Sequence, residues 1–193
     1  MNQVPELLEA LIHRHSTPAT CLTGPAPDDA TLKQILQAAE SAPDHGGLRP
    51  WRFLVIDGAA LEHLGEVFVE AMRAKDPEAS EDTLERERVR AQRAPMIIAA
   101  IAREEPGHAK IPAIEQLLAA GIATHQILLA ARAMGFGAVW LTGLRVYDDN
   151  VMRALGLAEN ERLIGLINIG HIKDGAPKRG KRRHQAEITR WTG

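Results

Sequence analysis

Apolar residues recur at helical spacing near the N-terminus, where four of them share one face: Leu7, Leu8, Leu11 and Ile12. A connection rich in Pro, Gly and Thr follows. Asp28 or Asp29 then offers an N-cap for a second amphipathic helix over residues 30–42. Further helical patterns cover residues 59–75, 78–94, 112–134 and 148–156. The helix over 78–94 carries mixed charges on most faces, so we expect it to be solvated.

Four apolar runs predict β-strands: residues 52–57, 96–102, 137–143 and 163–170. The run over 96–102 is almost wholly apolar, which is typical of a strand covered on both faces. Helices and strands interleave, but they do not form a strict series of βαβ units. The pattern therefore predicts an α+β fold in which a mixed central β-sheet is sandwiched between helices in three layers.

The chain has 193 residues, which suits a single domain over residues 1–193. A net charge of −2 argues against a protein that coats nucleic acid or an anionic membrane. A nucleic-acid-binding module built on the basic run "KRGKRRH" is one alternative, but no aromatic residues interleave with that run. With a single cysteine, no intramolecular disulfide can form. The N-terminus has no signal-peptide pattern and polar residues interrupt the longest apolar helix, so we expect a soluble, cytoplasmic protein.

Polar side chains gather in three segments. The segment "RHST", residues 14–17, ends the first helix with a cation, an imidazole and two hydroxyls, although the helix dipole alone explains a basic last turn. A second basic cluster, over residues 178–183, could be only a solvated end. Two separate basic clusters in a mildly acidic protein nevertheless favour one small anionic ligand, such as a phosphate. His45 is a third candidate, because it follows Asp44 in a glycine-rich loop where the backbone can approach a ligand closely.

Several well-known motifs are missing or lie in the wrong context. Gly135-Phe-Gly137 follows a helix and precedes a strand, which is the reverse of a dinucleotide-binding fingerprint and predicts a helix end. The histidines lack the spacing of a zinc motif, so no metal site is predicted. No Gly-x-Ser-x-Gly elbow offers a serine nucleophile. Trp51 is expected to pack in the core.

Three segments in this order resemble the FMN-dependent nitroreductase family: "RHST", "APDHGGLRPWRF" before the first strand, and "GFGAVWLTG" after the long helix. The chain is most similar to the small, single-domain NAD(P)H nitroreductases of that family, from about residue 7 to residue 170. The resemblance implies a nitroreductase-like homodimer with an extended C-terminal tail and two FMN sites at the interface. The segment after the first helix and the end of the third predicted strand would hold one FMN, and the loop before the first strand would reach it from the other subunit. The implied cofactor-binding residues are Arg14, His15, Ser16, Ser41, His45, Trp140, Leu141, Thr142, Gly143 and, in the tail, Lys181 or Arg182.

The same resemblance implies that the protein passes hydride from NADH or NADPH through the flavin to a small oxidant, such as a nitroaromatic or a quinone. In such a ping-pong scheme the cofactor carries the chemistry, so we assign no catalytic acid or base. An alternative is a flavin-binding protein that stores or senses FMN without efficient turnover. Many family members carry a basic residue near the flavin two positions after the serine of this segment, whereas this chain has Pro18. Unless another cation takes that place, the sequence leaves open how well the protein stabilises the anionic reduced flavin, and hence the reduction potential of the flavin.

Overall fold

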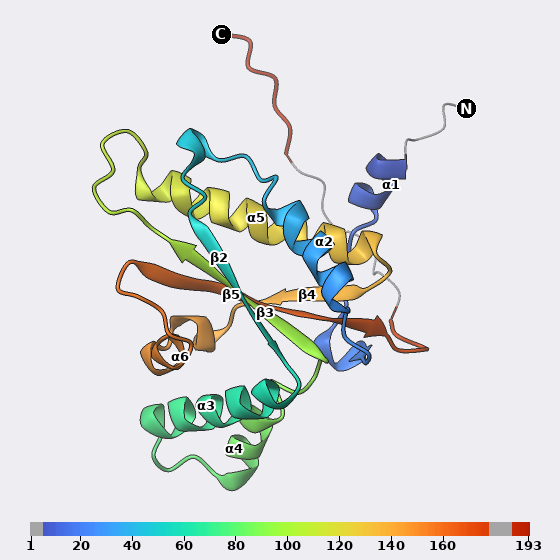
Figure 1. Cartoon of the computed structure of the whole chain (residues 1–193), viewed down its shortest axis with the longest axis vertical. Coiled ribbons are helices and arrows are strands. Elements are labelled where there is room, and N and C mark those ends of the chain that lie inside the picture. The colour runs from blue at the N-terminus through green and yellow to red at the C-terminus, as the bar shows by residue number, and fades with distance from the viewer. Residues whose placement is uncertain (1–5, 178–186) are drawn as a thin grey trace.

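The structure is a computed structural model, and it describes residues 6–177 and 187–193. A single β-sheet runs through its centre (Figure 1). The strands are β1 (Leu22–Thr23), β2 (Trp51–Asp57), β3 (Met96–Arg103), β4 (Gly137–Leu141) and β5 (Glu161–Ile172). They are ordered β1-β5-β3-β2, and β4 also pairs with β5.

Strand β5 is the centre of the sheet, and this corrects the expectation of a mixed sheet. Ile167 of β5 lies opposite both Ile98 of β3 and Trp140 of β4, so β3 and β4 flank β5 on its two sides. Both pairings are antiparallel, as are all the others among the described residues. Strands β3 and β4 run in the same direction, but they never pair because the last strand inserts between them. The α+β class itself is confirmed.

Helices cover both faces of the sheet, as the sequence predicts. The helices are α1 (Glu6–Ile12), α2 (Asp29–Ala39), α3 (Ala59–Lys75), α4 (Glu81–Arg88), α5 (Ala113–Ala133) and α6 (Asp149–Ala154). Short 3-10 turns are η1 (Ala19–Cys21), η2 (His45–Gly47) and η3 (Leu144–Tyr147). Helices α2 and α5 lie on one face, and α3 and α6 lie on the other (Figure 1). Helix α2 begins where predicted, because the Asp28 side chain accepts a hydrogen bond from the Thr31 amide.

Strand β3 supplies both hydrophobic cores. Because successive side chains of a strand point to opposite faces, Ile98 and Ala100 join the core under α2 and α5. Ile97 and Ile101 join the core on the side of α3 and α6. Trp51 is buried in the first of these cores, as expected.

Helix α5 has apolar residues on more than one face. Ala120, Ala123 and Ile127 are fully buried against the sheet. On another face Ile114 and Leu118 are each 59% exposed. By length and composition alone this helix could cross a membrane, so the polar interruptions in the sequence do not by themselves exclude that. Its packing in the core is that of a globular helix, and its exposed apolar face has no cover within the described part of one chain.

Candidate functional site

The segment over residues 14–17 is fastened to strand β4. The Thr17 amide donates a hydrogen bond to the Ala138 carbonyl at 3.0 Å, and the Thr17 side chain is buried. This close approach requires Gly137, since a Cβ there would lie 2.7 Å from Leu22 and 3.1 Å from the Cβ of Thr17. The structure therefore brings two of the predicted cofactor segments, residues 14–16 and 140–143, to the same strand of one chain.

Arg14 is half-buried and lies near α5. Its positive charge acts on His125, whose pKa is lowered first by burial and second by Arg14. His15 is also half-buried, with Nδ1 3.1 Å from the His13 carbonyl oxygen, while Ser16 is exposed. This short turn thus offers a guanidinium, an imidazole and a hydroxyl beside β4, which are donor groups suited to a phosphate.

At the end of β4, Trp140 is packed against the core, whereas the turn that follows it, residues 141–143, is exposed. The Trp140 indole lies over Gly165, and its Nε1–H donates to the Ile164 carbonyl at 3.0 Å. Its side chain therefore packs against the core and is partly buried. Leu141 is 44% exposed and Thr142 is exposed. Gly143 has a φ of 59°, in the left-handed region that favours glycine.

The loop before β2 is held in shape by its own polar groups. The Asp44 carboxylate accepts a hydrogen bond from the Arg49 amide at 2.6 Å, and Arg49 has a φ of 48°, which is unusual for a residue other than glycine. Ser41 Oγ donates to the Ala38 carbonyl at 2.8 Å at the end of α2. Gly46 packs so closely on Ile111 that a Cβ would lie 2.6 Å from its terminal methyl group.

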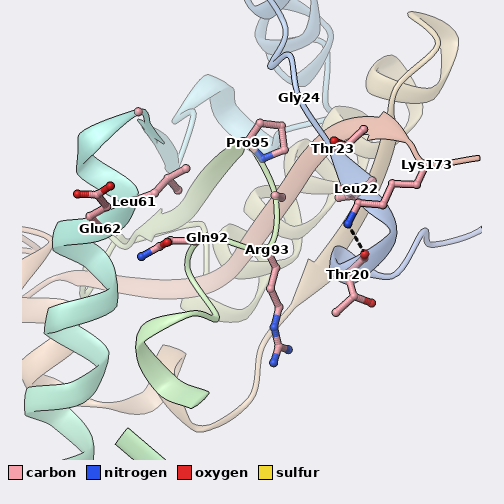
Figure 2. Close-up of a pocket in the computed structure, with 12 residues that line it drawn as sticks. Thr20, Leu22, Thr23, Gly24, Leu61, Glu62, Gln92, Arg93, Pro95 and Lys173 are labelled. Carbon is pink, nitrogen blue, oxygen red and sulfur yellow. Dashed lines mark hydrogen bonds between the residues drawn. The ribbon is translucent and has the colours of Figure 1, made fainter. Parts of the chain in front are cut away.

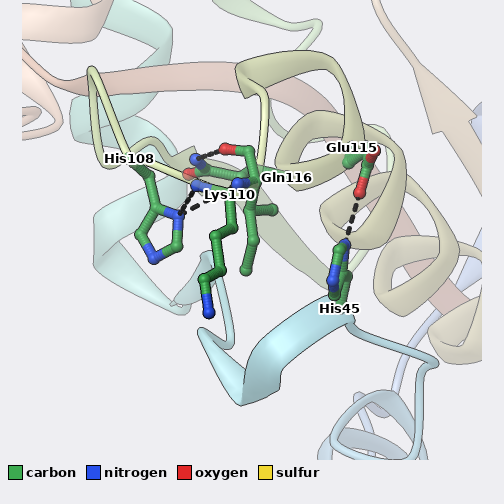
Figure 3. A network of polar contacts seen from close by, with 6 residues as sticks. His45, His108, Lys110, Glu115 and Gln116 are labelled. Atoms are coloured by element: carbon green, nitrogen blue, oxygen red, sulfur yellow. Dashed lines mark hydrogen bonds and ion pairs between the residues drawn. The ribbon is translucent and has the colours of Figure 1, made fainter.

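His45 points from this loop to the N-terminal end of α5. Its Nδ1 lies 2.7 Å from Glu115 Oε2 (Figure 3). Because a carboxylate only accepts, Nδ1 carries the proton and Nε2 remains for another partner. From Glu115 to His125, where Arg14 acts, the helix rises about 15 Å at 1.5 Å per residue. One chain therefore does not bring His45 to Arg14. Lys181 and Arg182 lie outside the described residues.

Sequence reasoning missed a charged pocket beside the Leu141–Gly143 turn. The helix predicted over 78–94 is shorter, Glu81–Arg88, and it is not simply solvated: the Glu87 side chain is only 7% exposed. The helix approaches α3 closely because Gly65 has no Cβ, which would lie 2.6 Å from the Arg88 carbonyl oxygen. Glu87 pairs with Arg145, which lies 58 residues further along the chain. A local sequence pattern cannot predict a pairing between residues so far apart.

A second, open cavity of about 550 Å³ lies near strand β1 (Figure 2). Lys173 lines it and donates from Nζ to the Thr20 carbonyl at 2.8 Å. Arg93 also lines it, and Figure 2 shows its guanidinium extending away from Pro95 and Lys173. This cavity contains none of the cofactor residues predicted from the sequence.

A comparison with known sequences identifies the protein family of this chain. A sequence profile of the nitroreductase family matches residues 13–171. The chain belongs to the nitroreductase family. This family member is 40% identical over 149 residues to a Haemophilus influenzae protein provisionally named NAD(P)H nitroreductase, covering 77% of this chain and 80% of that protein.

Solved structures share the fold of this nitroreductase-family protein. A nitroreductase-like protein from Bacillus cereus is 23% identical, with a TM-score of 0.79 and 98% of both chains covered. A nitroreductase with bound FMN from Bacteroides fragilis is 22% identical, with a TM-score of 0.72, covering 97% of this chain and 100% of that chain. At these identities the likeness concerns the fold, and the nitroreductase-like three-layer architecture is confirmed.

Proposed function

We propose that this protein is an FMN-dependent oxidoreductase that uses NADH or NADPH to reduce a small oxidant, such as a nitroaromatic or a quinone. The observation that carries the proposal is the hydrogen bond between Thr17 and Ala138, because it places the basic Arg14–Ser16 turn beside the strand that ends in the exposed Leu141–Gly143 turn. The name of the Haemophilus influenzae relative and the FMN in the Bacteroides fragilis structure support it.

The residues present suit FMN. Arg14 and Ser16 offer a cation and a hydroxyl to the phosphate, and His15 lies between them. The backbone of residues 140–143 and the exposed side chains of Leu141 and Thr142 offer a surface to the flavin ring. When bound, FMN accepts and donates hydride, and the chain's own residues need only bind and orient it. We accordingly assign binding roles and no catalytic acid or base.

The site is proposed to need two copies of the chain. Apolar side chains of α1 and α5 are exposed in one chain, among them Leu7 at 73% and Leu118 at 59%, and a homodimer would cover them. His45 lies at the N-terminal end of α5, far along that helix from Arg14, so it suits the site of the second copy better than its own. Ser41 belongs to the same loop as His45. In a two-fold dimer each site would then take Arg14, His15 and Ser16 from one chain and Ser41 and His45 from the other.

The experiment that tests this function combines an absorption spectrum with an assay of NADH or NADPH oxidation. The purified protein is expected to show a flavin absorption spectrum, to release the flavin on denaturation, and to oxidise NADH or NADPH steadily when a quinone or nitroaromatic is added. A ping-pong pattern of parallel double-reciprocal lines is expected. Bound flavin without turnover would favour a storage or sensing protein instead. Absence of flavin after incubation with FMN would contradict the proposal.

A further inference from the structure

The Leu141–Gly143 turn is fixed to the body of the protein at both of its ends. On the strand side Leu141, opposite Leu166 of β5, is the last residue of β4 in the sheet. On the other side η3 begins directly after the turn, and Val146 of η3 is buried in the core beside α3 and α6. Arg145 of η3 also points inward, and its side chain is only 22% exposed. The position of the exposed turn therefore depends on what holds η3.

The Arg145 guanidinium lies against this turn. A Cβ on Gly143 would lie 3.8 Å from Arg145 Nη1, so the guanidinium is within contact distance of the turn. Leu141, Thr142 and Arg145 together line a cavity of about 60 Å³. The guanidinium also lies over the Phe68 ring of α3, 5.2 Å from its centroid. Arg145 thus connects the turn to α3.

Glu87 of α4 holds this guanidinium in place. Its Oε2 accepts a hydrogen bond from Arg145 Nη2, and its Oε1 accepts one from Arg90 Nε at 3.0 Å. Arg90 lies only three residues after Glu87, so Arg145 is the partner that links Glu87 to a distant element. Burial disfavours the charged form of Arg145 and lowers its pKa. Because Arg145 Nε is buried without a hydrogen-bond partner among the described residues, the guanidinium depends on Glu87.

Helix α4 is itself fixed on α3, which makes Glu87 a firm anchor. The two helices approach closely at Gly65, where a Cβ would lie 2.6 Å from the Arg88 carbonyl oxygen. Arg88 Nε donates to Glu66 Oε1 of α3 at 2.5 Å, and the Glu66 side chain is 52% exposed. Glu87 and Arg88 are neighbours on α4, yet Arg88 forms a surface ion pair with α3, whereas the carboxylate of Glu87 is buried and reaches η3.

We propose that the ion pair between Glu87 and Arg145 positions the cofactor site, because it fixes the backbone of the Leu141–Gly143 turn in the conformation that receives the flavin ring. Both are positioning residues, which act through the turn and need no contact with the cofactor. Removing one partner of a buried pair leaves the other charge uncompensated, so the structure around it rearranges, and here the turn is the exposed neighbour. The effect on FMN rests on the proposed function, whereas the effect on the turn does not.

The test compares Arg145→Met with the wild-type protein in two measurements. The first needs no flavin: NMR relaxation gives the order parameters of the Thr142 and Gly143 amides in the apoprotein. These are expected to fall from about 0.85, which is typical of rigid backbone, to below about 0.6. The second is a fluorescence titration with FMN, in which affinity is expected to fall about tenfold, because a loosened turn must be ordered when the cofactor binds.

Two further variants complete the experiment. Arg88→Gln is the matched control, because it removes the ion pair of the neighbouring residue on α4, which reaches α3 and not η3. It is expected to leave the order parameters unchanged and FMN affinity within about twofold of wild type. Glu87→Gln keeps the shape of the side chain and one acceptor oxygen but removes the charge, so it is expected to loosen the turn and to weaken FMN binding about threefold.

The outcomes separate the inference from the function. A wild-type protein that binds no FMN would overturn the proposed function and, with it, the role of the ion pair in binding the cofactor. A loosened turn with unchanged FMN affinity would overturn the inference alone. Equal loosening in Arg88→Gln would also overturn it, because the effect would then be one of general stability. If Arg145→Met does not fold, unchanged order parameters in Glu87→Gln would contradict the inference.

Discussion

The Arg14–Thr17 segment and the Ser41–Pro50 loop are both predicted to contact the cofactor, yet the chain holds them in different ways. The first is bound to β4 by the hydrogen bond from Thr17 to Ala138. The second is bound to the N-terminal end of α5 by His45 and Glu115. One segment therefore lies beside β4, the strand that leads to the Leu141–Gly143 turn of its own chain, and the other lies at the N-terminal end of α5. In the proposed dimer, the residues of one site would be fixed to separate elements of the chain, and a second copy would complete the site.

The largest effect is expected at the first segment. Arg14→Glu should reduce FMN affinity severely, because losing a charge-assisted pair with a phosphate costs about 1.5–3 kcal/mol before the repulsion of the new carboxylate is added. Flavin content after purification and a fluorescence titration of the apoprotein measure the loss. Arg73→Glu, on the exposed surface of α3, is the control for the charge change. A variant at Arg14 that purifies fully flavinated would contradict the assignment.

The second prediction concerns the strand that anchors the other segment. Arg52 follows the loop and donates from Nε and from a terminal nitrogen to Glu161, both at 2.6 Å. Arg52→Gln should lower the free energy of unfolding by about 2 kcal/mol, less than a fully buried pair because Arg52 is 31% exposed. Chemical denaturation of the apoprotein measures it, and FMN affinity of the folded variant should stay within about twofold.

The stability lost in Arg52→Gln should be largest near neutral pH and smaller in acid. Hydrogen bonds from Arg52 lower the pKa of Glu161, so the stabilisation is present above the carboxyl's unfolded pKa of about 4.3 and is lost as the pH falls through the lowered value. The difference between wild type and Arg52→Gln should therefore shrink in acid. A difference that stays constant down to acid pH would show that the arginine acts by packing alone.

A smaller effect is expected at the contact that fixes the loop to α5. His45 and Glu115 are both substantially exposed, at 60% and 45%, so their pair contributes less than about 1 kcal/mol. Glu115→Leu should weaken FMN binding about two- to fivefold by freeing the His45 ring. On a His45→Ala background the same substitution should have no further effect. An equal loss on both backgrounds would mean that Glu115 does not act through His45.

Sequence patterns predicted the positions of the helices and strands better than they predicted which of these elements lie side by side. The apolar run of β3 and the cap at Asp28 are local signals, and both identify their elements correctly. The insertion of β5 between β3 and β4 depends on contacts between distant segments, so the antiparallel sheet could not be predicted from the order of elements. The burial of Glu87 depends in the same way on Arg145. The separation of His45 from Arg14 along α5 emerges only from the folded chain.

The smallest expected effect is a change in how the free energy of unfolding depends on pH, caused by His125, which lies near Arg14. The pKa of His125 is lowered from 6.5, so between the lowered value and 6.5 the unfolded chain binds more protons than the folded one. The free energy of unfolding of the apoprotein should therefore rise with pH through this window, and the gain should be lost as pH falls below 6.5. His125→Gln should remove that part of the rise, measured by denaturation between pH 5.5 and 7.5. An unchanged pH profile would contradict the assignment.

The most direct test of a site shared between two copies uses mixed dimers. Arg14→Glu and His45→Glu should each impair both sites of their own homodimer. Co-folding the two variants gives a mixed dimer with one doubly altered site and one wild-type site, because each site takes one residue from each chain. With random pairing about half of the dimers are mixed, so roughly a quarter of all sites should bind FMN normally. Native mass measurement establishes that mixed dimers have formed. If they form and no flavin binding returns, Arg14 and His45 act within one chain and the shared site is wrong.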